Sequence, residues 1–133
     1  MGENAKRVLI VDDDPDFVLS TRAVLAGAGY EIESCPNARD ALKTAREFKP
    51  DLMILDVMME TGSAGFKVSY EVRSDPEFAR MPILMVTAVH STTNIRFSPE
   101  TDKEFLPVDR LREKPVPADE LLREVAVLLG NRS

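Results

Sequence analysis

Several apolar runs of the chain end in residues whose side chains carry oxygen. These end residues are Asp12, Asp13 and Asp14 after the first run, Asp56 at the end of a second, and Thr87 after a third. If the runs are strands of one parallel sheet, their carboxyl ends meet at a single edge, where the carboxylates of Asp12, Asp13 and Asp56 gather with the hydroxyl of Thr87. Such a cluster indicates a site for a divalent cation and a phosphoryl group.

Carboxylates gathered at one edge need a cation between them. Two carboxylates about 4 Å apart repel each other by roughly 4 kcal/mol at an effective dielectric near 20. Oxygen ligands favour hard ions, and Mg²⁺ commonly takes one or two carboxylates together with water and a substrate phosphate. We therefore expect Mg²⁺ at this edge, with Mn²⁺ as an acceptable substitute. A carboxylate at such a metal can also act as a nucleophile toward phosphorus and form an aspartyl phosphate.

Lys114 could supply a second positive charge at the same edge. It directly follows the last predicted strand and precedes Pro115, so its ammonium can reach a bound phosphate as a point charge. The Thr87 hydroxyl can donate to a phosphoryl oxygen. Taken one at a time, an Asp after a strand is more often a turn or cap residue, and a Lys before Pro is more often a solvated surface residue. The occurrence of all these groups at the ends of predicted strands favours the functional interpretation.

The elements that would position these side chains alternate between strand and helix. Short apolar runs predict strands at 7–11, 30–34, 52–55, 82–86 and 109–113, the last weakly hydrophobic and typical of a sheet edge. Apolar residues at helical spacing predict helices at 15–27, 38–48, 66–73 and 117–129, the second with Asn37 as its N-cap. This alternation predicts an α/β fold with a parallel sheet covered by helices on both faces.

Length and composition fit one globular domain. The 133 residues carry 17 basic and 23 acidic side chains, and the net charge of -6 argues against autonomous binding to nucleic acid. Cys35 is the only cysteine, which excludes an intrachain disulfide, and we expect it to be a buried apolar side chain. No apolar run approaches the roughly 18 residues of a membrane span, and the first residues lack an apolar signal segment. These features favour a cytoplasmic protein without membrane contact.

Four motifs of this chain together resemble the receiver domain of two-component response regulators. They are Val11-Asp12-Asp13-Asp14-Pro15, Asp51-Leu52-Met53-Ile54-Leu55-Asp56-Val57-Met58-Met59, Met85-Val86-Thr87-Ala88 and Glu113-Lys114-Pro115-Val116. The resemblance spans residues 7–129. It implies a flavodoxin-like, doubly wound, five-stranded parallel sheet with strand order 2-1-3-4-5 and helices on both faces.

The resemblance also implies a role for each residue at the acidic edge. Asp56 matches the phosphoacceptor, and Thr87 and Lys114 match the hydroxyl and the ammonium that contact its phosphoryl group. The positions that match metal ligands are Asp12, Asp13, Asp56 and Met58, the last through its backbone carbonyl.

The function implied by this resemblance is that of a stand-alone receiver. We expect residues 1–133 to form one domain, with a core at about 7–129 and no output domain. It would accept a phosphoryl group from the phosphohistidine of a sensor histidine kinase or a histidine phosphotransfer protein. The signal would then pass to a downstream protein by contact, with the receiver as a monomer or weak dimer. We do not expect an enzyme in the turnover sense, because the chemistry is limited to its own phosphorylation and dephosphorylation.

Three features depart from the family pattern. After the phosphoacceptor position, Glu60-Thr61-Gly62-Ser63-Ala64-Gly65 replaces the usual Pro-Gly loop and is one residue longer. Leu111 stands where many receivers have an aromatic switch residue, and the segment 90–107 is unusually long and rich in polar residues. We hypothesise that this segment is the signalling surface; a long solvated loop anchored by Phe97 and Phe105 is the alternative. A short helix is predicted there only at 99–104.

Two other functions compete with the receiver interpretation. A pseudo-receiver that acts as a phosphorylation-independent binding module is the main alternative, supported by Leu111 and the altered loops. A Mg²⁺-dependent phosphatase of the haloacid dehalogenase type is disfavoured, because those enzymes carry a second Asp two residues after the nucleophile, where this chain has Met58.

Overall fold

The computed structural model describes residues 5–56, 64–87, 110–114 and 116–130, and of 64–66, 87, 111 and 113 it describes the backbone alone. The metal-ligand prediction for Met58 lies outside these residues. So do the segment 90–107, which we expect to signal, and the short helix predicted at 99–104.

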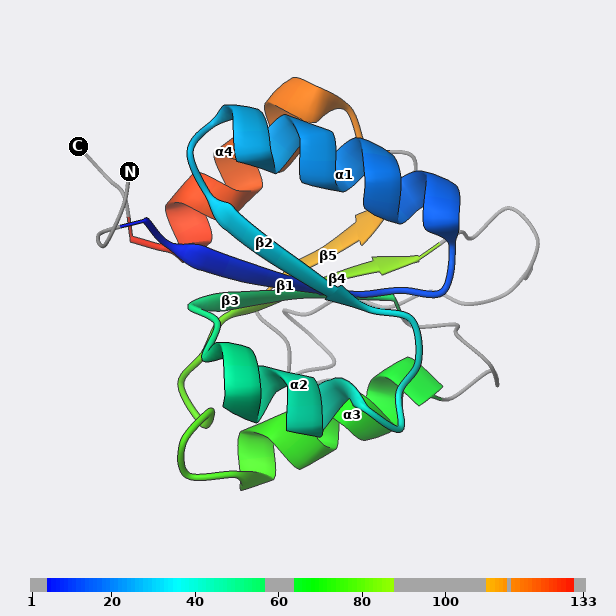
Figure 1. The fold of residues 1–133 in the computed structure, drawn as a ribbon, viewed down its shortest axis with the longest axis vertical. Coiled ribbons are helices and arrows are strands. Elements are labelled where there is room, and N and C mark those ends of the chain that lie inside the picture. Colours follow the sequence, from blue (N-terminus) through cyan, green and yellow to red (C-terminus); the bar gives the residue numbers. More distant parts are fainter. Residues whose placement is uncertain (1–4, 57–63, 88–109, 115, 131–133) are drawn as a thin grey trace.

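The described residues form one parallel sheet with helices on both faces (Figure 1). The strands are β1 (Arg7–Val11), β2 (Glu31–Cys35), β3 (Leu52–Asp56), β4 (Ile83–Thr87) and β5 (Arg110–Glu113), in the order β2-β1-β3-β4-β5. The helices are α1 (Pro15–Gly27), α2 (Ala41–Phe48), α3 (Ala64–Ser74) and α4 (Ala118–Leu128). The α/β fold class and the strand order 2-1-3-4-5 are therefore confirmed.

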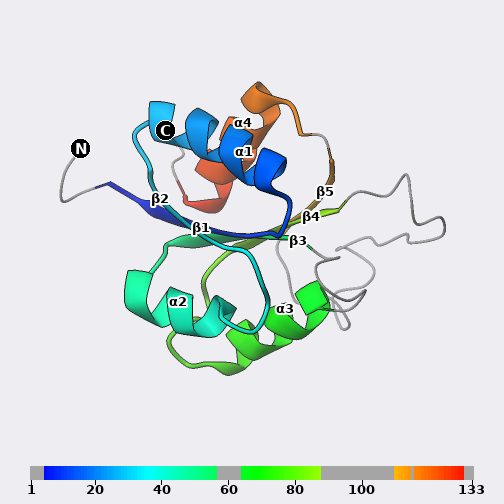
Figure 2. The same ribbon diagram turned by 45° about the vertical axis from the view of Figure 1, so that its right-hand side comes forward.

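The central strands lack polar alternation because helices cover both of their faces. Helices α1 and α4 lie on one side of the sheet and α2 and α3 on the other, as two views agree (Figures 1 and 2). Successive side chains of a strand point to opposite faces. The strand residues packed toward α1 and α4 include Val8, Ile10, Leu52 and Ile54, and those packed toward α2 and α3 include Leu9, Val11, Met53 and Leu55. The sheet thus lies between two layers of helices, with one apolar core on each of its faces.

The start of α2 differs from the sequence prediction. The helix begins at Ala41 with Asp40 as its N-cap residue, so the prediction of Asn37 as the cap is wrong. Asn37 Oδ1 instead accepts a hydrogen bond from the backbone N–H of Asp40 at 2.9 Å, which forms a turn before the helix. Lys49 ends α2 with φ at 57°, consistent with the predicted stop, because the following Pro50 disfavours a helical conformation at this position.

The other boundaries shift little. β2 begins at Glu31, one residue later than predicted, and α3 begins at Ala64, two residues earlier. Cys35 is buried, as predicted, and its thiol donates to the backbone carbonyl of Asn37 at 3.1 Å.

Ion pairs tie the edge strand β5 to α4. Arg110 and Arg112 lie two residues apart, on one face of the strand. Both guanidinium groups bind the carboxylate of Glu124, Arg110 at 2.9 Å and Arg112 at 2.7 Å, and Arg112 also binds Glu120. Glu124 is buried, with only 6% of its surface exposed. Besides its parallel pairing with β4, this weakly hydrophobic strand is thus joined to α4 by ion pairs.

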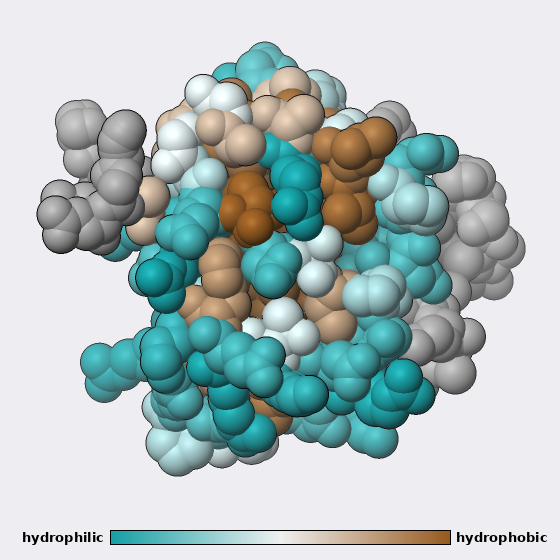
Figure 3. Space-filling view, in the orientation of Figure 1, coloured by the Kyte–Doolittle hydropathy of each residue, from teal (hydrophilic) through white to brown (hydrophobic). Residues whose placement is uncertain are grey.

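The surface seen in Figure 3 is hydrophilic over α2, whereas hydrophobic residues show mainly in the half that contains α1. Leu19 on α1, Tyr70 on α3 and Val127 on α4 are large apolar side chains that are exposed. They lie on separate helices. Within the described ranges, every helix is too short or too polar to cross a membrane.

Candidate functional site

The parallel direction of the strands brings the predicted site residues to one edge. Val11 of β1 pairs with Leu55 of β3, so Asp12 and Asp56, each one residue further on, end adjacent strands side by side. Asp56 itself pairs with Val86 of β4, and Thr87 is the next residue. Lys114 follows the end of β5. The edge predicted from the apolar runs therefore exists in the folded chain.

Three of the acidic residues form a compact cluster. Each of Asp12, Asp13 and Asp56 offers a carboxylate oxygen, and these oxygens all lie within 4.8 Å of one another. Asp12 and Asp56 are buried, with 1% and 4% of their surface exposed, whereas Asp13 is exposed. The cluster thus joins two buried carboxylates to one that water can reach.

Asp12 is held from two sides. Its backbone N–H donates to the carbonyl of Cys35 at 3.1 Å, and its Oδ1 accepts from the backbone N–H of Asp14 at 2.9 Å. Its Oδ2 is buried, and it accepts no well-directed hydrogen bond from the described residues. Burial raises the pKa of Asp12, although the Asp14 N–H and the charge of Lys114 act in the opposite direction. The cost of burying the charged form therefore exceeds the stabilisation that these two partners give it.

Lys114 points its ammonium into this cluster. Its Nζ lies 3.0 Å from Asp12 Oδ2, 3.7 Å from Asp14 Oδ2 and 3.8 Å from Asp56 Oδ2. It also lies 4.4 Å from the centre of the Phe17 ring. The lysine side chain is only 13% exposed. An ammonium carries three N–H donors, so a contact with Asp12 does not prevent Lys114 from binding a further acceptor.

The donor set fits a hard divalent cation. Three close carboxylates repel one another, and Asp12 Oδ2 is a buried oxygen that makes no well-directed hydrogen bond with the described residues. Mg²⁺ and Mn²⁺ prefer such oxygen ligands and accept water at the open positions. The exposure of Asp13 leaves one side open to water and to a phosphate. The backbone of Thr87 is placed beside the cluster, while its hydroxyl is outside the described atoms.

Two residues next to Lys114 were not predicted from the sequence to contact it. Asp14 is one of the acidic residues at the end of the first apolar run, and Phe17 lies within the helix predicted at 15–27, but the sequence patterns predict no contact of either with Lys114. In the structure, Asp14 caps α1 and faces Lys114, and the Phe17 ring lies beside the ammonium. One sequence signal could have identified Phe17. Side chains in a helix lean toward its N-terminus, so an aromatic residue in the first turn covers the preceding strand end.

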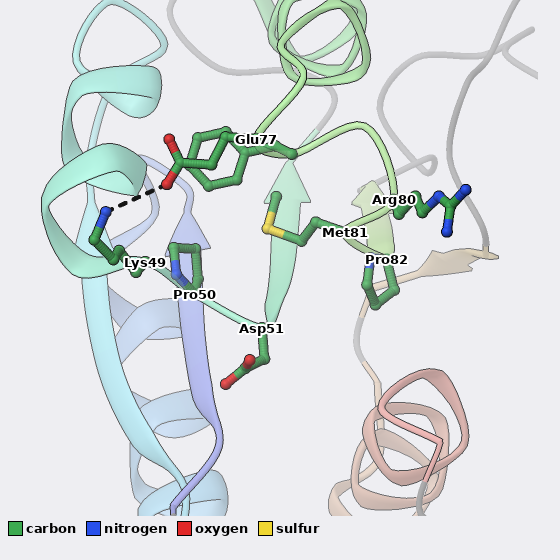
Figure 4. Close-up of a pocket in the computed structure, with 8 residues that line it drawn as sticks. Lys49, Pro50, Asp51, Glu77, Arg80, Met81 and Pro82 are labelled. Carbon is green, nitrogen blue, oxygen red and sulfur yellow. Dashed lines mark hydrogen bonds and ion pairs between the residues drawn. The ribbon is translucent and has the colours of Figure 1, made fainter.

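A shallow pocket of about 290 Å³ lies at the opposite edge of the sheet, before β3 and β4 begin (Figure 4). Its lining residues are Lys49, Pro50, Asp51, Glu77, Phe78, Arg80, Met81 and Pro82. Lys49 and Glu77 form an ion pair across its rim at 3.3 Å. A five-residue strand is about 16 Å long, so the pocket is too far from the acidic edge to share its chemistry.

Comparisons with known proteins agree with this geometry. The family model described as the response regulator receiver domain matches residues 8–125. Protein PilH of Pseudomonas aeruginosa is 32% identical over 128 residues, which cover 93% of this chain and 98% of the relative. The DNA-binding response regulator MtrA of Mycolicibacterium smegmatis is 35% identical over 95 residues, which cover 71% of this chain but only 40% of the relative. The solved structure of the chemotaxis response regulator CheY4 of Vibrio cholerae matches with a TM-score of 0.79 and 28% identity, over 94% of this chain and 99% of that one.

Proposed function

Because this chain belongs to the response regulator receiver family, we propose that Asp56 accepts a phosphoryl group from a phosphohistidine in a Mg²⁺-dependent reaction. Receiver domains of this family accept phosphoryl groups as their general function, and they typically bind Mg²⁺ in an acidic pocket. The observation that carries the proposal is the position of Asp56. It is buried beside Asp12 and Asp13, with a lysine ammonium 3.8 Å from its Oδ2.

In this proposal, each residue at the acidic edge of the sheet has its own role. Asp12, Asp13 and Asp56 would hold Mg²⁺ together with the backbone carbonyl of Met58, and the ion would neutralise charge on the phosphoryl oxygens. An oxygen of Asp56 attacks phosphorus, the bond from phosphorus to the donor nitrogen breaks, and the donor imidazole leaves with a proton from water. Lys114 has donors available for a phosphoryl oxygen.

Thr87 and Lys114 would then hold the phosphoryl group on Asp56. Lys114 acts as a point charge, and the Thr87 hydroxyl donates a hydrogen bond. Since Thr87 is the last residue of β4, Lys114 follows β5, and these two strands are neighbours in the sheet, a change at Asp56 can reach both strands directly. The partners in this proposal are a sensor histidine kinase or a histidine phosphotransfer protein as donor, and a downstream protein that reads the phosphorylated surface.

We further propose that residues 7–129 act as one receiver unit in the cytoplasm. The similarity to PilH supports this, because the match covers nearly all of both chains. The longer relative MtrA, of which this chain spans 40%, shows that the same kind of unit also occurs within larger proteins.

The proposal is tested with fluoroberyllate, which mimics a phosphoryl group on a carboxylate. We expect fluoroberyllate with Mg²⁺ to shift the backbone NMR signals of Asp56 and its strand neighbours, and a small acyl phosphate to add one phosphoryl group to the intact protein. Asp56→Asn is the matched control, since it keeps the shape of the side chain and should lose both effects. A wild-type protein that shows neither response would point instead to a phosphorylation-independent binding module.

A further inference from the structure

We propose that Phe17 is a positioning residue that holds the ammonium of Lys114 at the acidic edge of the sheet. The inference rests on the proposed phosphorylation of Asp56 and assigns a further residue to that reaction. Its central observation is the 4.4 Å distance between Lys114 Nζ and the centre of the Phe17 ring. An ammonium within about 6 Å of an aromatic ring centre is attracted by the negative face of the ring.

The first turn of α1 fixes the place of the ring. Asp14 is the N-cap residue, and its Oδ1 accepts from the backbone N–H groups of Asp16 at 3.0 Å and Phe17 at 3.3 Å. Pro15 begins the helix, where its restricted φ suits the first position. Because side chains of a helix lean toward its N-terminus, the ring of Phe17 is directed back toward the strand ends. The cap therefore determines which way the ring faces.

The ring is anchored on its other side by the core. Phe17 packs against the apolar cluster between the sheet and the helices α1 and α4, which contains Val8, Leu25 and Val125. A ring that is half-buried in this way has little freedom to rotate away from Lys114. The contact is thus part of the packed interior of the protein.

The two buried carboxylates attract the Lys114 ammonium unequally, because they lie at different distances from it. Asp12 Oδ2 lies 3.0 Å from the ammonium and Asp56 Oδ2 lies 3.8 Å away, so charge alone draws the ammonium toward Asp12. The ring attracts the ammonium without neutralising it, and it leaves the N–H donors available for oxygen acceptors. With only 13% of the lysine side chain exposed, the attraction is weakly screened by water.

The structure therefore assigns Phe17 a task that differs from those of the acidic residues. The ring holds the ammonium at the acidic edge while the oxygen partners of the lysine change from carboxylates to phosphoryl oxygens. An apolar residue without a ring would fill much of the same space, but it would not attract the ammonium and would leave it freer to move away from the edge. Phosphorylation would then become slower without a loss of Mg²⁺ binding.

The test compares Phe17→Leu with Phe17→Tyr, which keeps the ring, and with Val24→Ala as a packing control. Val24 lies on α1 two turns further on and packs against the same cluster. Phe17→Met serves as a second ring-free variant in case the leucine variant does not fold. In each protein we would measure the proton chemical shifts of the Lys114 ε-methylene group, the Mg²⁺ affinity, and the rate of phosphorylation by a small acyl phosphate at saturating Mg²⁺.

We expect the ring-free variants to lose the upfield ring-current shift of Lys114 and to be phosphorylated about two- to tenfold more slowly. Their Mg²⁺ affinity should be unchanged or higher, whereas a general structural defect would lower it. Phe17→Tyr should keep both the ring-current shift of Lys114 and the wild-type rate of phosphorylation, and Val24→Ala should change neither.

Two results would overturn the inference alone. One is a ring-free variant that is phosphorylated at the wild-type rate, and the other is an equal slowing in Phe17→Leu and Val24→Ala. If wild-type protein is not phosphorylated at all, the proposed function fails and the inference fails with it, even where the ring-current shift of Lys114 is present.

Discussion

Lys114 Nζ lies 3.0 Å from Asp12 Oδ2, so the ammonium stands beside a carboxylate that also belongs to the candidate metal cluster. The Lys114 ammonium and a divalent cation bound by the cluster would therefore lie close together at the acidic edge of the sheet. Because like charges at such distances repel each other, the position of Lys114 lowers the affinity of the cluster for Mg²⁺. It also places positive charge beside Asp56, where a phosphoryl group would arrive.

We predict opposite effects of Lys114→Met on metal binding and on phosphorylation. Removal of the ammonium should raise the Mg²⁺ affinity by about tenfold, because one repulsive charge is lost. The rate of phosphorylation by a small acyl phosphate should fall, because the phosphoryl oxygens lose a cation. Isothermal titration calorimetry measures the affinity. Lys49→Met is the control, since Lys49 lies at the opposite edge of the sheet; a fall in Mg²⁺ affinity in Lys114→Met would contradict the prediction.

A second prediction concerns pH and Asp12. Burial raises the pKa of this carboxyl above its ordinary value of 3.8, so the folded protein binds the proton more tightly than the unfolded chain does. The free energy of unfolding therefore falls as the pH rises from the unfolded pKa through the folded pKa. Each unit of pKa elevation corresponds to about 1.4 kcal/mol. Without divalent cations, Asp12→Asn should thus be more stable than wild type at neutral pH.

The gain in Asp12→Asn should shrink in acid, where wild-type Asp12 is itself protonated. Urea unfolding at neutral pH and near the ordinary pKa of aspartate measures the difference. Asp13→Asn is the control, because Asp13 is exposed and should gain less. A less stable Asp12→Asn at neutral pH would mean that attraction to Lys114 outweighs the effect of burial.

The third prediction addresses the ion pairs between β5 and α4. Glu124→Gln should lower the free energy of unfolding by about 1–3 kcal/mol, because both Arg110 and Arg112 lose a charged partner that is 6% exposed. Glu120→Gln is the matched control on the same helix. Its side chain is 37% exposed, so its loss should cost less than about 1 kcal/mol. Equal losses in the two variants, measured by urea unfolding, would show that burial of Glu124 adds nothing.

A fourth prediction separates the two tasks of Asp14. Asp14→Ala removes the cap of α1 and should lower the free energy of unfolding by about 1 kcal/mol, whereas Asp14→Ser keeps a capping oxygen and should lose only a few tenths. Both variants remove the carboxylate that lies 3.7 Å from Lys114. If the charge alone matters, the two variants will be destabilised to the same extent in thermal unfolding.

Much of the fold could be predicted because its signals are local. Apolar runs of four or five residues mark the buried strands, and the alternation with helical spacing leaves few ways to assemble a parallel sheet. The start of α2 could not be predicted in this way. Asn37 has the residue type of a helix cap, but its side chain accepts a hydrogen bond from the backbone N–H of Asp40 in a turn that precedes the helix. Residue type alone does not distinguish these two uses of the same amide.

The sequence patterns also did not predict the ion pairs between β5 and α4. Arg110, Arg112 and Glu124 are ordinary charged residues in the chain, and their pairing depends on how α4 packs over the end of the sheet. Charge on an edge strand usually indicates solvent contact, whereas here it joins two elements. Only the packing decides which of the two applies.

The sequence by itself determined that Asp12, Asp13, Asp56, Thr87 and Lys114 would meet at one edge. The physical reason is that the carboxyl ends of parallel strands lie at the same edge of a sheet, whatever the length and sequence of the loops that follow them. The tertiary structure alone decided the distances that make chemistry possible, including 3.0 Å from Lys114 to Asp12 and 4.4 Å to the ring of Phe17. Those distances depend on how α1 packs against β2 and α4. The contact between Phe17 and Lys114 joins residues nearly a hundred positions apart, so it leaves no periodic signal in the chain.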